Sequence, residues 1–264
     1  MTWVRKRVLV TVKAAPEPSK KYSDSVCTAG ITDNGEFIRL YPIPFQVFRS
    51  GVRFKKFEWI EVDCEPSTRE KRSRKESYKI RPDSLKIVDR SLSTAPIDWR
   101  GREHALSMVP RLSIEELETA FKAERASLGL VRVQELAEFY KTSDADEQAL
   151  EAQHAFQMVF DPHGGTRVQT PLQHVPHVFK YRFSCNRAGI ACRGHDTTCE
   201  DWELFESNRS WRERYPGAEE LWQKLHYRFF DGMKTRDLQF FVGTHSLYPV
   251  WMVVGLYYPP LPAA

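Results

Sequence analysis

The feature that most constrains this chain is a succession of short strand-like runs, separated by turn residues, between residues 7 and 88. The runs are rich in β-branched and aromatic residues, and no helical apolar stripe interrupts them. Residues 32–35 (TDNG) separate two of the runs, and Asn-Gly between apolar segments is a strong signal for a β-hairpin. Because several short strands must bury one common face, the pattern predicts a small closed or partly closed β-barrel.

The rest of the chain mixes helical and strand patterns. Ser113 and Glu116 form a capping box that predicts a helix start, whereas residues 130–140 fit a strand or a helix. The C-terminal third contains two helical stripes and at least three strand-like runs. The expected fold class is α+β: an OB-like β-barrel at 1–95, a connector with one helix at 96–150, and a mixed α/β domain with a metal-stabilised loop at 151–264.

Residues 27–30 (CTAG) and 35–39 (GEFIR) carry a resemblance to a known family. They resemble the opening of the dual OB-type domains of bacterial genome-conflict proteins, which combine a Lys-rich strand, a Cys-x-Ala-Gly step and a Gly-x-x-x-Arg strand. The resemblance covers roughly thirty of the 264 residues, and the pattern departs from the family after Leu40, where two prolines enter. It implies an OB-like barrel that binds single-stranded nucleic acid, in a DNA-processing or phage-defence setting.

Basic charge is concentrated in one segment. The net charge is +4, yet residues 69–81 alone hold seven Lys or Arg against two Glu, so the remainder is nearly neutral. A focused basic segment is typical of a nucleic-acid footprint, although a solvated loop explains it too. We expect exposed rings among Tyr41, Phe45 and Trp59 to stack on bases. The residues expected to bind nucleic acid are Arg39, Tyr41, Arg69, Arg72, Arg74, Lys75 and Lys79.

Three of the five cysteines lie close together, with the spacing C-x6-C-x2-H-x3-C. Four soft or borderline ligands match what a closed, structural zinc site requires. Two glycines in this stretch would let backbone N–H groups turn toward the sulfurs. Buried thiols and a redox pair are the alternatives. The predicted zinc ligands are Cys185, Cys192, His195 and Cys199.

A catalytic interpretation competes with the structural one. In it the chain is a metal-dependent nuclease, with a C-terminal site drawn from His195, Asp201, Glu203 and Asp237, joined by His226 or Asp231. Asp201 and Glu203 also suit the first turn of a helix, where carboxylates complement the helix dipole. The sequence contains none of the common phosphate-binding or metalloprotease motifs. Whether the protein is an enzyme therefore stays open.

Composition excludes several classes of protein. Hydrophobic residues make up 41% and charged residues 28% of the chain, which is ordinary for a globular domain. No apolar run approaches the roughly eighteen residues that span a bilayer, and the N-terminal residues read as a strand rather than a signal peptide. An odd, small number of cysteines argues against a disulfide framework. We expect a cytoplasmic protein with no membrane partner; a protein partner for the basic segment is a third interpretation.

Overall fold

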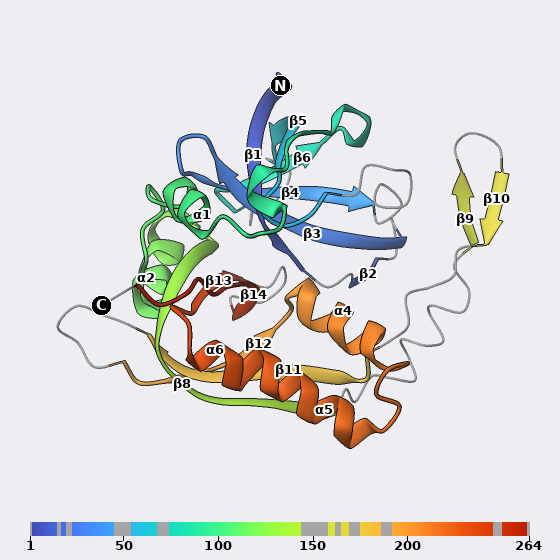
Figure 1. Cartoon of the computed structure of the whole chain (residues 1–264). Helices are drawn as coiled ribbons and strands as arrows, with labels where there is room; N and C mark the ends of the chain where they lie inside the picture. Colours follow the sequence, from blue (N-terminus) through green and yellow to red (C-terminus); the bar gives the residue numbers. More distant parts are fainter. Residues whose placement is uncertain are drawn as a thin grey trace.

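The computed structural model describes residues 2–14, 17–19, 23–44, 54–67, 74–143, 158–161, 165–168, 175–185, 192–244 and 250–262 (Figure 1). The N-terminal half contains strands β1 (Val4–Lys13), β2 (Glu17–Ser19), β3 (Ser23–Thr32), β4 (Phe37–Pro44), β5 (Trp59–Pro66), β6 (Ser77–Ile80) and β7 (Lys86–Asp89), with 3₁₀ turns at Pro82–Ser84 and Ser91–Ser93. Helices α1 (Trp99–Ala105) and α2 (Ile114–Glu124) follow. The C-terminal half contains β8 (Leu128–Ser143), β9 (Met158–Asp161), β10 (Gly165–Val168), β11 (His177–Cys185), β12 (His195–Cys199), α4 (Trp202–Trp211), α5 (Ala218–His226), a π-helical turn (Tyr227–Asp231), α6 (Gly232–Lys234), β13 (Gln239–Thr244) and β14 (Trp251–Tyr257).

The predicted N-terminal barrel is confirmed. Five strands follow one another in the order β1-β3-β4-β6-β5, and β5 pairs back with β1 to close the ring. Residues 32–35 form the turn of the predicted hairpin, and Gly35 has the positive φ, +74°, that this turn requires. Inward-facing apolar side chains fill the barrel, among them Val8, Val10, Ile38, Leu40, Ile60 and Val62.

The C-terminal half is also a barrel, which corrects the expectation of a mixed α/β domain. Its strands close in the order β11-β12-β14-β13-β8. The ambiguous residues 130–140 belong to the long strand β8, because alternate residues such as Val131 and Phe139 point into the barrel core. The predicted helices appear as α4 and α5, which lie along this barrel (Figure 1). The predicted domain limits at 95 and 150 stay a prediction.

The two barrels share one topology. In each, the first strand pairs with the second and the fourth, the second with the third, and the fifth lies between the third and the fourth. In each barrel the third strand pairs in parallel with the fifth: β4 with β6, and β12 with β14. This strand order is that of the OB-like barrel, a five-stranded Greek-key barrel. The chain is therefore a pair of OB-like barrels with a few added helices.

Residues 8–12 of strand β1 are buried on both faces of the strand, and this fixes the arrangement of the barrels. Val8 and Val10 point into the first barrel, whereas Leu9 and Val12 point out of it, into a separate apolar layer. That layer also holds side chains of the second barrel, including Phe241, Val254 and Tyr257. An added Cβ at Gly255 would lie 3.3 Å from the Thr11 carbonyl oxygen, so this position admits little more than a glycine. The continuous apolar run of β1 is thus typical of a strand covered on both sides.

A buried ion pair crosses the same interface. The Lys56 ammonium lies 2.9 Å from Asp201 and 3.1 Å from Glu203. It also donates to the Leu256 carbonyl oxygen, and the Lys56 and Asp201 side chains are almost completely buried. Burial alone would lower the pKa of Lys56, but the two carboxylates outweigh it and raise that pKa. The lysine is therefore charged, and it joins the first barrel to the beginning of α4.

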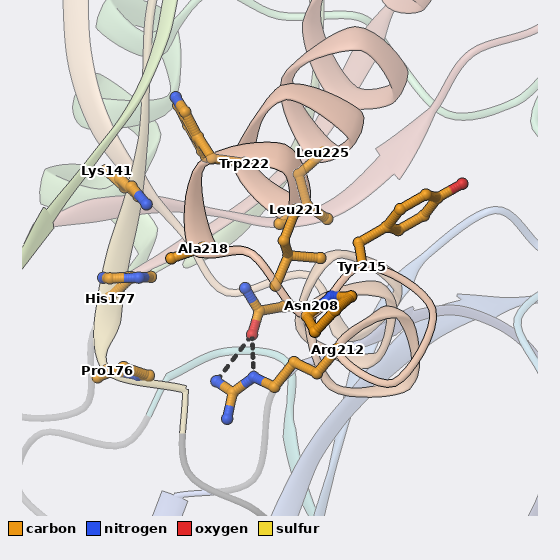
Figure 2. A pocket seen from close by; sticks show the side chains of 11 residues that line it. Lys141, Pro176, His177, Asn208, Arg212, Tyr215, Ala218, Leu221, Trp222 and Leu225 are labelled. Atoms are coloured by element: carbon orange, nitrogen blue, oxygen red, sulfur yellow. Dashed lines mark hydrogen bonds between the residues drawn. The ribbon is translucent and has the colours of Figure 1, made fainter.

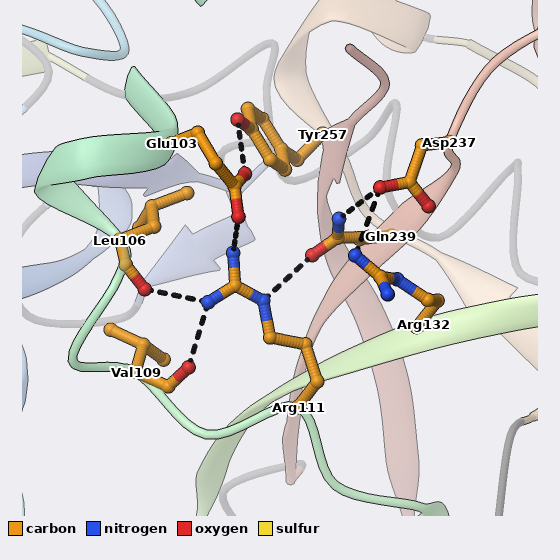
Figure 3. Close-up of polar contacts among 8 residues, drawn as sticks. All are labelled: Glu103, Leu106, Val109, Arg111, Arg132, Asp237, Gln239 and Tyr257. Atoms are coloured by element: carbon orange, nitrogen blue, oxygen red, sulfur yellow. Dashed lines mark hydrogen bonds and ion pairs between the residues drawn. The ribbon is translucent and has the colours of Figure 1, made fainter. Parts of the chain in front are cut away.

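Arg111 fixes the connection between the barrels (Figure 3). Its guanidinium donates to the carbonyl oxygens of Leu106 and Val109, to Glu103 and to the Gln239 side chain. The first three acceptors lie just before it in the chain and the last lies on β13, so one side chain ties the connecting segment to the second barrel. Arg132 and Asp237 form an ion pair beside it.

We predict that Lys56→Met lowers the free energy of unfolding by about 3–5 kcal/mol, because removing one partner of a buried pair leaves charge uncompensated. Urea unfolding measures this directly. Lys55→Met is the matched control, since the Lys55 side chain is exposed, and it should change the value by no more than about 0.5 kcal/mol. Equal stabilities for the two variants would contradict the role assigned to Lys56.

Candidate metal centre and nucleic-acid interface

Four side chains converge at the end of the second barrel. Cys185 is the last residue of β11, His195 the first of β12, and Cys192 lies in the connection between them. Glu115 reaches the same place from the first turn of α2. One ligand atom from each lies within 4.8 Å of the others, so this group could hold a metal ion.

The distances fit tetrahedral coordination. The Cys185 and Cys192 sulfurs are 3.7 Å apart. Two sulfurs that each lie about 2.3 Å from zinc at a tetrahedral angle would be separated by about 3.8 Å. The Nε2 atom of His195 lies 3.3 Å from the Cys185 sulfur and 3.1 Å from the Cys192 sulfur. One carboxylate oxygen of Glu115 lies 3.7 Å from the Cys185 sulfur, and the other lies 3.8 Å from His195 Nε2. The same sulfur separation is far too long for a disulfide, whose bond is about 2.05 Å.

The local backbone directs two N–H groups toward the Cys192 sulfur. The amide groups of Cys185 and Gly194 both donate to the Cys192 sulfur. Gly194 does so with a φ of +81°, a conformation that favours glycine, as the sequence predicted. Burial raises the pKa of the Cys185 thiol to about 12 and lowers the pKa of the His195 imidazole. The imidazole is therefore neutral, the form that binds metals.

Cys199 does not join this group, in contrast to the predicted ligand set. Residues 195–199 form strand β12 rather than a loop, so four residues separate Cys199 from His195 by about 13 Å along the strand. Cys199 is completely buried in the core of the second barrel, opposite Phe179 on β11. Glu115, seventy positions before Cys185, takes the fourth place. No spacing rule could have found it, although the capping box correctly marked the start of its helix.

The candidate catalytic residues contact different partners and do not form one cluster among the described residues. Asp201 caps α4 through Glu203 N, accepts from Leu256 N, and pairs with Lys56, so its carboxylate is fully used. Asp237 pairs with Arg132. His226 and Asp231 form a contact of their own, with 3.4 Å between His226 Nδ1 and an Asp231 carboxylate oxygen. His195 lies apart from them, in the group with Glu115, Cys185 and Cys192. Within the described residues the structure assigns Asp201 and Glu203 a structural role.

The predicted nucleic-acid residues divide into accessible and inaccessible ones. Arg39 is buried and donates to Ser127 of the second half, so it serves the barrel interface rather than a ligand face. Tyr41, two positions further along the same strand face, is 39% exposed. Lys75 pairs with Glu124, and Trp59 lies half-buried beneath Arg7. Arg74 is partly exposed, whereas Phe45, Arg69 and Arg72 lie outside the described residues.

Cations and aromatic rings lie near one another along β6 of the first barrel. Tyr41 on β4 stands in register with Lys79 on β6. The Lys6 ammonium lies 5.2 Å from the ring centre of Tyr78. A similar pair, in which the Arg81 guanidinium lies 4.3 Å from the Trp3 ring, follows at the end of β6. Tyr78 packs against the barrel core, whereas Tyr41 and Lys79 point to the other face of the sheet, so we name only the outward-facing residues the cation–ring strip: Trp3, Tyr41, Lys79 and Arg81.

Two family models match the sequence, one for each barrel. The model described as "Domain of unknown function (DUF8758)" matches residues 4–108, and "Domain of unknown function (DUF8757)" matches residues 110–264. The change from one to the other falls next to Arg111. In a comparison with curated proteins, none matches this sequence.

A solved structure, described as "Structure and Conformational Change of a Replication Protein A Heterotrimer Bound to ssDNA", contains a chain similar to this one. The two share 10% identity with a TM-score of 0.37, over 99% of this chain and 50% of that chain. This chain thus spans about half the length of the protein it matches. A likeness this distant identifies neither a ligand nor a partner.

No helix among the described residues has the length and apolar character needed to cross a bilayer.

We predict that Cys192→Ser removes most of the metal that copurifies with the protein, and that Glu115→Gln weakens metal retention. Cys199→Ala should keep about one metal ion per chain, because Cys199 contributes only to the core. Elemental analysis by mass spectrometry after dialysis measures the three contents. Metal lost from Cys199→Ala but kept by Glu115→Gln would restore the ligand set predicted from sequence.

Proposed function

We propose that this chain, which belongs to the DUF8757 family, is a nucleic-acid-binding protein that holds single strands on its N-terminal barrel. The observation that carries the proposal is the position of the basic segment. OB-like barrels bind oligonucleotides on their second and third strands and on the loops that join strands one to two and four to five. In this barrel the connection between the fourth and fifth strands, β5 and β6, contains residues 69–75, the most basic part of the chain.

The cation–ring strip supports the same surface. Tyr41 projects from the third strand of the barrel, β4, and Lys79 lies beside it on the fifth. Cations that track phosphates, combined with rings on which bases stack, are what sequence-tolerant binding of single strands requires. Among the described residues, Arg74 and Lys75 lie in this connection, and Lys79 and Arg81 follow on and just after β6.

We propose zinc as the metal of the second barrel, bound by Glu115, Cys185, Cys192 and His195. Two thiolates, an imidazole and a carboxylate suit zinc better than magnesium or calcium, which prefer oxygen ligands. When bound, the metal would supply a cross-link between α2 and the β11–β12 pair. Four protein ligands would complete a tetrahedral site, so its role is structural.

The biological setting remains a proposal of its own. A role in DNA processing or phage defence rests on the resemblance of residues 27–39 to dual OB-type domains, and a cytoplasmic location rests on the small, odd number of cysteines. The alternative, a metal-dependent nuclease with a C-terminal active site, stays a prediction; two of its candidate carboxylates, Asp201 and Asp237, form ion pairs with Lys56 and Arg132.

We predict that Tyr41→Ala weakens binding of fluorescent oligo-dT by an amount equivalent to about 1–3 kcal/mol, the worth of one stacked base. The melting temperature should change little, because the ring is partly exposed. Tyr227→Ala, at a tyrosine that is 70% exposed on the second barrel, is the matched control and should bind as wild type. Fluorescence anisotropy gives the affinities; an unchanged affinity in Tyr41→Ala removes the tyrosine from the interface.

We predict that the double variant Lys79→Gln, Arg81→Gln reduces the salt dependence of that binding. Each lost phosphate contact on a single strand lowers the slope of log K against log salt by about 0.7, so two lower it by about 1.4. Lys224→Gln, at an exposed lysine on α5 of the second barrel, should keep the wild-type slope. A wild-type slope in the double variant would show that phosphates lie elsewhere.

A further inference from the structure

A pocket of about 250 Å³ opens in the second barrel where β11 begins, at His177 (Figure 2). The candidate metal ligand Cys185 lies at the other end of the same strand. One wall comes from the end of β8 and the beginning of β11, which pair with each other there. The opposite wall comes from α4, α5 and the turn that joins them. Its lining residues are Lys141, Pro176, His177, Asn208, Arg212, Tyr215, Pro216, Ala218, Leu221, Trp222 and Leu225.

The charge of this pocket is one-sided. Lys141 and Arg212 are two fixed cations of the lining, and no aspartate or glutamate lines it. In the part of the chain that the structure describes, no carboxylate oxygen lies within 4.0 Å of either cation. A pocket with cations on both walls and no acid is suited to an anion.

Arg212 is the better placed of the two. Its Nε and Nη2 atoms donate to the Asn208 side-chain oxygen at 3.2 and 2.9 Å, and Asn208 is itself 3% exposed (Figure 2). A neutral oxygen therefore orients the guanidinium without neutralising it. Burial, and then the charge of Arg209, lower the pKa of Arg212, yet a guanidinium stays protonated in any case. The remaining N–H groups have the fork geometry that matches a phosphate.

The rest of the lining is apolar and aromatic. Leu221, Trp222 and Pro176 belong to this lining, and the Trp222 side chain lies on the same side as Lys141 (Figure 2). The Lys141 ammonium lies 5.0 Å from the ring centre of Trp222, which holds this cation at the mouth of the apolar wall. The volume lies just below the range of roughly 300–1,000 Å³ for drug-sized ligands, so the ligand must be small. The two cations can bind one anionic group, and the apolar and aromatic side chains beside them can contact a flat ring. A phosphate ester that carries a flat ring has both of these parts.

We propose that this pocket is a binding site for a nucleoside monophosphate, with Arg212 and Lys141 on the phosphate and the Trp222–Leu221 wall against the nucleoside. The same chemistry is offered by a free mononucleotide and by the phosphorylated end of a strand. The site lies on the second barrel and uses none of the cation–ring strip, so it stands whether or not the N-terminal barrel binds single strands.

Isothermal titration calorimetry of the full chain with AMP, adenosine and inorganic phosphate tests the site. AMP should bind at least about tenfold more tightly than adenosine, because hydrogen bonds to a charged group depend on the phosphate. Arg212→Gln should weaken AMP binding at least about tenfold, and Lys141→Gln should weaken it in the same direction. Arg214→Gln is the matched control: Arg214 is exposed, lies two positions from Arg212 and is not part of the lining.

Competition separates the two sources. A short oligo-dT with a 5′-phosphate that displaces AMP, when the 5′-hydroxyl form does not, identifies a strand end; failure of both to displace bound AMP identifies the free nucleotide. Repeating the AMP titration in Tyr41→Ala, which should match wild type, keeps this test apart from the N-terminal interface. The proposal is overturned if AMP does not bind wild type, if adenosine binds equally well, or if Arg212→Gln and Lys141→Gln, each folded by circular dichroism, bind AMP as wild type does.

Discussion

The Lys56 ammonium and the Asp201 carboxylate meet where two barrels and a helix come together, and much of the molecule depends on that contact. The Asp201 side chain caps the start of α4 and accepts a hydrogen bond from the backbone amide of Leu256 on β14. It also forms the ion pair with Lys56 of the first barrel. Since α4 starts there, the positions of Asn208 and Arg212, about two and three turns later, are set by the same contact. An ion pair of this kind gives little net stability compared with an apolar pair, but it tolerates only one relative placement of its partners.

The metal centre and the ion pair act at opposite ends of the second barrel. Glu115 brings α2 to the β11–β12 connection, whereas Asp201 follows the end of β12. A metal bound to His195 would hold β12 at its first residue, and the helix cap holds the chain just beyond its last. Because β12 pairs with β14 only at Cys199 and Val253, external supports at both ends matter more here than in a long antiparallel pair.

Local signals predicted local structure well. Asn34-Gly35 marked its hairpin and Ser113 its helix, because turn and cap chemistry act within a few residues. The cysteine spacing found three of the four metal-site residues and failed at Cys199, since a run of five residues that forms a strand cannot curl around an ion. The role of Glu115, the distant partners of Asp201 and the burial of Arg39 could not be predicted, because each depends on a segment 55 or more positions away. The second barrel was missed for the same reason: its five strands are spread over 130 residues and separated by helices.

The apolar layer between the barrels bears on how such chains can be rearranged. The two family models meet next to Arg111, so the sequence looks like two modules placed end to end. Physically they are not interchangeable parts, because Leu9, Val12, Phe241 and Tyr257 form one continuous core that belongs to neither barrel. A gene fusion that joined either barrel to a new neighbour would also transfer its half of this core. The transferred apolar side chains would be exposed to solvent and would promote aggregation. Recombination at this junction would therefore be selected against unless the incoming partner brought a matching face, and the two halves should be inherited together.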